Sequence, residues 1–525
     1  MKNYTFDRNI SREVLENYLS RSVTAAGLFE SETLEDDLRV IRKLGVKFLG
    51  RASGIWYMPQ KDEEHFAMTK ALAEKVHQVD PEIILQACVF EWVTENMETV
   101  QIPEHVFADF QIPVEKRNFR LQDVLFQGEP QDFIHKRENP AKNGGIPDLN
   151  RLETQLWFYY RATQYINCGF EALHMGQIHL YTANDIGFVH TQEVFTRIRQ
   201  YAEKNARRHK VLLDAHTHGV NIHGKLLFDY HAMPFTRAPL LEREGTKLVL
   251  VREGYSEGGV NPNGFTADTM PYLMEYDNWG GLLVENPEEC PREELAYQDW
   301  WGWDQIAWFA HQNEAERNRF IEYTYKWIAV NNPNGYFEVP FRRMLGDGYV
   351  TARVDGKEKK QTVYQVNNPG VGCPMGFGQE SAVEKIWNSG NSLREQAANP
   401  EMLIDYGARQ VVDPETGVKL PEKIVVYGSF QPSVGAVKND SNSEITRMYY
   451  VGNQTYSLTV ILPYAGSYDF AVSTYGTLSA TYTDKDRFPR SGSSNKSIFT
   501  TEQDNMAVKF TYCFHTNQVT VQLFS

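Results

Sequence analysis

Short apolar runs alternate with helical segments along the chain up to about residue 345. The segment after the first apolar run, for example, carries Leu34, Leu38, Ile41 and Leu44 at helical spacing. This alternation is typical of a (β/α)8 barrel, in which helices join successive parallel strands. The seven clearest strands are expected at residues 23–29, 46–49, 83–90, 170–175, 211–215, 272–276 and 336–341.

The middle of the expected barrel is irregular. Only about ten residues separate Ala215 from Leu226, whereas a helical crossover between parallel strands needs roughly a dozen or more. Either one helix is missing, or residues 226–233 belong to a hairpin and residues 247–251 are another candidate for strand six. The predicted fold class is therefore α/β, a TIM-type barrel that is irregular around strands 5–6.

The character of the chain changes after residue 345. Residues 346–420 are rich in Gly, Pro and Asn, and short runs with period-two alternation follow, such as IVVYG and AVKFTY. This pattern predicts an antiparallel β-sandwich. We expect three parts: a catalytic barrel at 1–345, a connecting region at 346–420 and an accessory sandwich at 421–525. The sandwich could bind glycan, but a module that packs against the barrel is the more common case.

Five of the apolar runs contain or end in a carboxylate or a histidine. Barrel enzymes place their reactive side chains at the C-terminal ends of the strands, so this recurrence predicts one shared site. The runs are CVFEW with Glu91, GFEALH with Glu171 and His174, LLDAH with Asp214 and His216, FDYH with Asp229 and His231, and LMEYD with Glu275 and Asp277.

Composition narrows the classes of partner. A formal net charge of -15 over 525 residues, without a basic run, argues against a nucleic-acid partner. Aromatic residues make up 13% of the chain, which suits ligands with apolar faces and polar edges, such as sugars. The five cysteines are scattered and form no CxxC pair, and we expect no cofactor. The oligomeric state is left open.

The sequence also bears on location. The first residues lack the basic start and apolar stretch of a signal peptide, and no run is long enough to span a membrane. We therefore expect a cytoplasmic protein without membrane contact, or a secreted or periplasmic one if a leader has been trimmed.

A barrel with acids on successive strands and a C-terminal sandwich resembles bacterial glycoside hydrolases. The resemblance is architectural and covers about residues 23–345. In the large barrel clan of retaining glycosidases, the acid/base lies at the end of strand four and the nucleophile at the end of strand seven. The resemblance thus implies Glu171 and Glu275, although the Asn that usually precedes the strand-four acid is Phe170 here.

The chemistry of glycosidic cleavage independently requires two carboxyl groups, one to protonate the leaving oxygen and one to attack carbon or activate water. We assign these roles to Glu171 and Glu275, with Asp277 and Glu91 as substitutes. The other reading of Glu171 is a buried, hydrogen-bonded position low in the barrel. The expected contacts to the carbohydrate substrate are Glu91, His174, Gln177, Asp214, His216, Asp277 and Trp279.

Two rival hypotheses remain. His216 and His218 resemble the HxH pair that binds metal in amidohydrolase-type barrels, which would make the protein a metal-dependent hydrolase. The leading hypothesis assigns no metal, because histidines in a carbohydrate site commonly bond to hydroxyls or neighbouring acids. The chain could also be a glycan-binding barrel without catalytic activity.

Overall fold

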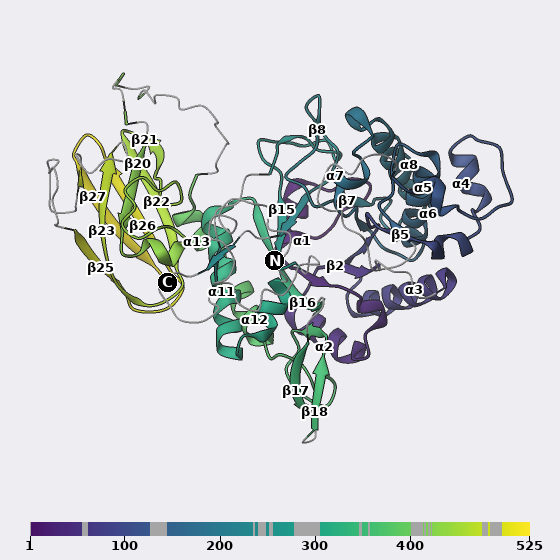
Figure 1. Cartoon of the computed structure of the whole chain (residues 1–525), viewed down its shortest axis with the longest axis horizontal. Helices are drawn as coiled ribbons and strands as arrows, with labels where there is room; N and C mark the ends of the chain where they lie inside the picture. Colours follow the sequence, from purple (N-terminus) through teal and green to yellow (C-terminus); the bar gives the residue numbers. More distant parts are fainter. Residues whose placement is uncertain are drawn as a thin grey trace.

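The protein consists of a parallel barrel with a β-sandwich beside it (Figure 1). The computed structural model describes residues 2–54, 61–126, 144–234, 237–239, 248–250, 256–277, 305–345, 349–354, 357–400, 413, 416–417, 420–421, 423–474, 481–482 and 496–525.

Eight parallel strands follow one another around the barrel in chain order. They are β1 (Ser22–Ala25), β2 (Phe48–Ser53), β3 (Ile84–Cys88), β6 (Ala172–His174), β7 (Leu212–Asp214), β10 (His231–Pro234), β15 (Tyr272–Glu275) and β16 (Gly335–Met344). A parallel bridge between His216 and Ala232 closes the ring, and the Ala232 amide donates to the Ala215 carbonyl at 3.1 Å. The predicted α/β barrel fold is confirmed by this pairing.

Amphipathic helices cover the outside of the barrel. The helix α2 buries Leu38, Ile41 and Leu44 and ends at Gly45, whose left-handed conformation (φ +66°) suits glycine. The apolar residues from 303 to 330 predict one long helix, but the described residues of this segment form two. Asn313 caps the second helix by accepting a hydrogen bond from the Glu316 amide. The outer helices are α2 (Leu34–Leu44), α3 (Asp62–Val79), α6 (Leu152–Asn167), α8 (Val189–Asn205), α10 (Gln305–His311) and α11 (Glu314–Asn331).

Shorter elements fill the loops after the strands. After β3 lie β4 (Val93–Thr94), α4 (Glu104–Asp109), α5 (Leu121–Val124) and β5 (Gly144–Gly145), and after β6 lies α7 (Ile178–Tyr181). After β16 come β17 (Val350–Val354), β18 (Lys357–Gln361), β19 (Val363–Gln365), α12 (Glu380–Asn388) and α13 (Ser392–Ala397).

The predicted irregularity around strands 5–6 is confirmed. The described residues between β7 and β10 hold a hairpin and no helix, and β10 itself is strand six. Residues 248–250 pair with β11 outside the barrel and do not supply that strand. The small strands of this region are β8 (Asn221–Ile222), β9 (Lys225–Leu226), β11 (Arg237–Pro239), β12 (Leu248–Leu250), β13 (Gly259–Val260) and β14 (Thr266–Ala267).

An apolar floor closes the N-terminal end of the barrel. The helix α1 (Arg12–Leu19) places Val14, Leu15 and Tyr18 against apolar side chains at the starts of the strands. These partners include Phe48, Ile84, Ala172, Leu212, Tyr230 and Leu273. Because alternate residues of each strand share a face, the next inward positions lie above this floor and form the polar interior.

The sandwich consists of two antiparallel sheets around a separate apolar core. Ile461, Tyr464 and Ala507 nevertheless belong to the core of the barrel, and the Tyr464 hydroxyl lies 3.1 Å from a carboxylate oxygen of Glu316 on α11. The sheets are formed by β20 (Ile424–Gly428), β23 (Gly466–Thr474), β24 (Thr481–Tyr482) and β25 (Ser497–Thr501), and by β21 (Tyr449–Gly452), β22 (Thr455–Leu462), β26 (Met506–Cys513) and β27 (Gln518–Phe524).

Within the described part of the chain, none of the helices has the length and apolar character required to span a lipid bilayer.

Candidate active site

Polar and charged side chains gather inside the barrel above the apolar floor, toward the C-terminal ends of the strands. We refer to them as the mouth cluster, and each is less than a tenth exposed. The cluster consists of Arg51, Glu91, His174, Asp214, His216, Glu275, Asp277, Glu338 and Arg343.

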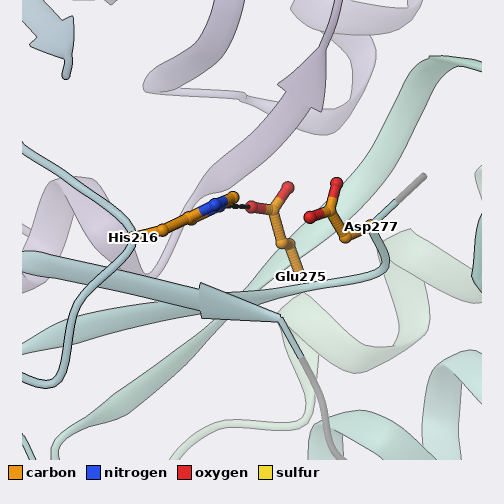
Figure 2. Close-up of side chains that lie close together, drawn as sticks. All are labelled: His216, Glu275 and Asp277. Carbon is orange, nitrogen blue, oxygen red and sulfur yellow. Dashed lines mark hydrogen bonds and ion pairs between the residues drawn. The ribbon is translucent and has the colours of Figure 1, made fainter. Parts of the chain in front are cut away.

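Glu275, the last residue of β15, lies at the centre of the cluster. Its Oε1 contacts Arg51 Nη2 and lies 2.8 Å from His216 Nε2, and Figure 2 shows the imidazole and the carboxylates of Glu275 and Asp277 directed toward one another. Burial raises the pKa of Glu275, but the positive charge of Arg51 and the hydrogen bond with His216 outweigh it and leave the pKa below its ordinary value. Glu275 is therefore held as an ionised carboxylate.

The two oxygens of Glu275 differ in their surroundings. Oε1 is engaged by Arg51 and His216, whereas Oε2 has no hydrogen-bond partner among the described residues. Arg343 Nη1 lies 3.8 Å from Oε2. A buried carboxylate oxygen without a hydrogen bond is costly to maintain, and such exceptions in a native protein require an explanation.

A bulge in β2 turns Arg51 into the barrel. Phe48 packs in the floor and Gly50 faces Glu338, so regular alternation would direct Arg51 outward. The pairing of β2 with β3 shifts register between Leu49 and Ser53, and Arg51 has a left-handed backbone with φ +56°. Bulges re-aim side chains, and strained backbone in a non-glycine residue is concentrated at functional sites.

A second irregularity accompanies Arg343 on β16. The pairing of β16 with β1 passes from Pro340 opposite Thr24 to Arg342 opposite Ala25, so one residue is inserted in β16. This insertion reverses the alternation that begins at Glu338 and brings Arg343 to the interior. Its Nη2 lies 2.7 Å from Asp277 Oδ1, and the side chain is buried.

Asp214 lies deeper, at the end of β7, and both of its oxygens are engaged. Oδ1 accepts from Gln86 Nε2 at 2.6 Å and from the Tyr230 hydroxyl at 3.0 Å, and Oδ2 lies 2.8 Å from His174 Nδ1. Burial raises the pKa of Asp214 to about 7, against the opposing hydrogen bond from Tyr230 and the charge of Arg51. Because its oxygens face these partners, we interpret Asp214 as the residue that orients His174. The rings of His174 and His216 are arranged edge to face, with 4.7 Å between their centroids.

Glu91 approaches the cluster from the loop after β3. Its Oε2 accepts a hydrogen bond from the Gln177 amide at 3.1 Å. Gly176 makes room for this carboxyl, because a Cβ there would lie 1.9 Å from Oε2 and the backbone has φ +59°. Burial raises the pKa of Glu91, although this amide and the charges of His216 and Arg51 oppose the shift. Glu91 thus retains its proton to higher pH than an exposed glutamate.

Glu171 is not part of the mouth cluster, which corrects its expected pairing with Glu275. It precedes β6, at the N-terminal end of the barrel, and both carboxylate oxygens accept hydrogen bonds from Arg208 at 2.7 and 2.6 Å. Arg207 adds a contact at 3.1 Å, and Arg208 also contacts Tyr18 of the floor. The apolar run GFEALH places Glu171 before the strand and only His174 at its end.

The run with Asp229 and His231 also lies at the start of a strand. Asp229 precedes β10 and binds Arg199 Nη2 at 3.0 Å, and His231 is the first residue of β10. Of the expected substrate contacts, Glu91, His174, Asp214, His216 and Asp277 come together in the cluster, Gln177 contributes its backbone amide to Glu91, and Trp279 lies outside the described residues.

The two histidines of the HxH pair lie in different surroundings. His216 is buried in the cluster, whereas His218 is exposed. Among the described residues, His216, Glu275 and Asp277 do offer ligand atoms within 4.8 Å of one another. Arg51 and Arg343 already contact the carboxylates of this group, and a metal ion would have to compete with both guanidinium groups. We therefore assign no metal to it.

Sequence reasoning missed four polar residues of the barrel interior: Arg51, Gln86, Glu338 and Arg343. Gln86 and Glu338 follow the inward alternation of β3 and β16, so a polar residue within an apolar strand was an available signal. The two arginines offered only the weaker signal of a charge inside an apolar run, because bulges reverse the faces on which alternation would place them.

No protein-family model and no curated protein matches this chain. Solved structures to which it is similar include the isomalto-dextranase of Arthrobacter globiformis T6 complexed with panose, with 9% identity over 96% of this chain and 74% of that chain and a TM-score of 0.35. Another is a β-L-arabinopyranosidase from Geobacillus stearothermophilus, with 10% identity over 87% and 88% of the chains and a TM-score of 0.31.

A third similar structure is TtGalA, the α-galactosidase of Thermus thermophilus in complex with stachyose. It has 11% identity to this chain and a TM-score of 0.24, over 39% of this chain. The aligned region spans 44% of the galactosidase, which is less than half of its length. The fold assignment rests on the strand pairing of this chain itself.

Proposed function

We propose that this protein is a glycoside hydrolase that cleaves an O-glycosidic bond with Glu91 as proton donor and Glu275 as nucleophile or general base. The observation that carries the proposal is the opposite displacement of two buried carboxyl pKa values in one barrel mouth, with Glu91 raised and Glu275 lowered. Environments that separate the pKa values of two neighbouring acids divide the roles of acid and base between them.

The expected protonation of the two acids fits both proton transfer to the leaving group and attack on the anomeric carbon. A protonated Glu91 can donate to the leaving oxygen, and the ionised Glu275 can attack the anomeric carbon or remove a proton from water. Oε2 of Glu275 has no hydrogen-bond partner within the described ranges, which fits an oxygen that acts on a substrate. Arg51 and His216 hold Oε1 and fix the orientation of the carboxylate.

The remaining polar groups would contact the sugar. We assign His174, His216 and Asp277 to its hydroxyl groups. The two arginines are paired with Glu275 and Asp277. Burial raises the pKa of the other three carboxyls, Glu91, Asp214 and Glu338, so the described cluster carries little net charge. An uncharged carbohydrate is therefore a better fit than an anionic one.

The test is a series of aryl and alkyl glycosides with leaving groups of different acidity. We expect Glu91→Gln to lose about 10²- to 10⁴-fold in kcat/KM on alkyl glycosides, whose leaving oxygen needs a proton, and much less on dinitrophenyl glycosides. Glu275→Gln should lose activity on both. Glu171→Gln serves as the control, since that carboxylate is equally buried but lies at the other end of the barrel.

Two outcomes would overturn the proposal. One is a loss in Glu91→Gln that is the same for every leaving group. The other is glycan binding, seen as a raised Tm, without released reducing ends on prolonged incubation with the folded wild-type protein. The second outcome would identify a glycan-binding barrel without catalytic activity. Loss of activity after chelation, with stoichiometric metal in the untreated protein, would instead support the metal-dependent alternative.

A further inference from the structure

Glu338 is a third carboxyl group next to Glu275 that the proposed roles do not use. It lies opposite Glu275 in the parallel pairing of β15 with β16, and it is 3% exposed. Gly50 on β2 provides its space, because a Cβ there would lie 1.8 Å from Glu338 Oε1. The absence of a side chain at Gly50 therefore allows the carboxyl group of Glu338 to lie in the interior of the barrel.

Glu338 lacks the partners that its neighbours have. Its Oε1 is buried and has no hydrogen-bond partner, and no lysine, arginine or histidine forms a salt bridge with it among the described residues. By contrast, Arg51 contacts Glu275, and Arg343 Nη2 lies 2.7 Å from Asp277 Oδ1.

Counting charges indicates which acid carries a proton. The cations of this group are Arg51, Arg343 and, when protonated, His216, and each of them contacts Glu275 or Asp277. The group also contains the carboxyl of Glu338. If all three carboxyls were ionised, one buried negative charge would lack a partner, and a buried charge of this kind is neutralised by protonation. Glu338 is the carboxyl without a cation, so the proton belongs there.

We propose that Glu338 is a positioning residue whose carboxyl stays protonated beside Glu275, so that the charges of Arg51 and Arg343 act on Glu275 and Asp277. The link to reaction rate rests on the proposed function, but the protonation state does not. The pKa of Glu338 agrees with this assignment, because burial and the negative charge of Glu275 raise it to about 8. Other titratable groups that act on this region are Asp214 and Tyr230, from β7 and the residue before β10.

Infrared difference spectroscopy tests the protonation state without any substrate. The carbonyl stretch of a protonated carboxyl is separate from the carboxylate bands, so we compare wild type with Glu338→Gln at about pH 7 and about pH 9. We expect one protonated-carboxyl band at neutral pH that the variant lacks and that fades at the higher pH. The control is Glu380→Gln, because salt bridges to Arg39 and Lys43 accompany a pKa of about 2 for Glu380. That variant should lose only a carboxylate band.

Absence of a protonated band attributable to Glu338 at neutral pH would overturn the proposal. If Glu338→Gln does not fold, Glu338→Asp takes its place: it keeps a titratable group but withdraws it from Glu275, so the band should remain and its midpoint should change. An unchanged midpoint would show that contact with Glu275 does not govern the proton.

The positioning role has a kinetic readout. When Glu338 ionises above its pKa, it adds a negative charge beside Glu275, and Gln cannot do so. The ratio of kcat/KM in Glu338→Gln to that in wild type should therefore rise about three- to tenfold between about pH 7 and about pH 9. Glu91 is present in both proteins and cancels in the ratio. A constant ratio would refute the positioning role even if the infrared result holds, and an inactive wild type would refute the proposed function while leaving the infrared result intact.

Discussion

The two ends of the barrel each hold a buried glutamate with arginine partners, but the hydrogen bonds to its carboxylate oxygens differ. At the N-terminal end, both oxygens of Glu171 are bound by Arg208 in a bidentate pair. At the C-terminal end, Arg51 and His216 hold one oxygen of Glu275, and the other has no hydrogen-bond partner in the part of the chain that the structure describes. Burial and arginine contacts therefore do not distinguish these two glutamates, whereas the unpartnered oxygen and the end of the barrel do.

Replacing each glutamate by glutamine should produce the largest difference between the two ends of the barrel. We expect Glu275→Gln to lower kcat/KM by at least about 10³-fold, since the nucleophile or base is lost while size and shape are kept. Glu171→Gln should leave kcat/KM per folded molecule within about twofold of wild type. The measurement is steady-state hydrolysis with protein whose folded fraction has been determined by circular dichroism. Equal losses in both variants would show that the two ends are not functionally distinct.

Stability should respond in the opposite order. Glu171→Gln leaves two arginines without their carboxylate, and removing one partner of a buried ion pair costs several kcal/mol, so we expect about 3 kcal/mol of lost unfolding free energy. Glu275→Gln should cost less, because one oxygen is already without a partner. Urea unfolding monitored by tryptophan fluorescence measures both. A Glu171→Gln protein as stable as wild type would contradict the structural role of this pair.

A smaller loss of activity is expected when the carboxyl group of Glu91 is displaced. Gly176→Ala would bring a Cβ 1.9 Å from Glu91 Oε2, and displacing that carboxyl should lower kcat/KM by about tenfold. Gly187→Ala is the matched control, since Gly187 has a similar φ of +73° but no atom within 4 Å of the added Cβ. Any loss shared by both variants reports backbone strain alone. Identical activities would show that the position of Glu91 has no bearing on catalysis.

The fold was largely predictable because its signal is periodic. Alternating strands and helices gave the barrel, and the short connection after Ala215 correctly indicated an irregular middle. The break at Asn313 was missed because apolar residues continue through it, and only the cap separates α10 from α11. Period-two runs correctly gave the strands of the sandwich.

The site was only partly predictable. The apolar runs correctly indicated that Glu91, His174, His216, Glu275 and Asp277 lie together at one end of the barrel, and their roles stay predictions. The position of Glu171 was predicted wrongly because an apolar run can begin before its strand does. Glu171 directly precedes β6, whereas His174 is the last residue of that strand. The inward position of Arg51 could not be predicted, because it depends on a bulge that the alternation of residues does not reveal.

If Glu91 is the acid and Glu275 the nucleophile or base, their oppositely shifted pKa values govern the two limbs of the pH profile. The measurement is the pH dependence of kcat/KM in wild type and Glu91→Gln. Activity should fall at low pH as Glu275 is protonated through its lowered pKa, and at high pH as Glu91 loses its proton through its raised pKa. In Glu91→Gln, the fall attributable to Glu91 should disappear and the acid limb should remain. A high-pH limb in Glu91→Gln with the same midpoint and depth as in wild type would contradict the assignment of Glu91 as the acid.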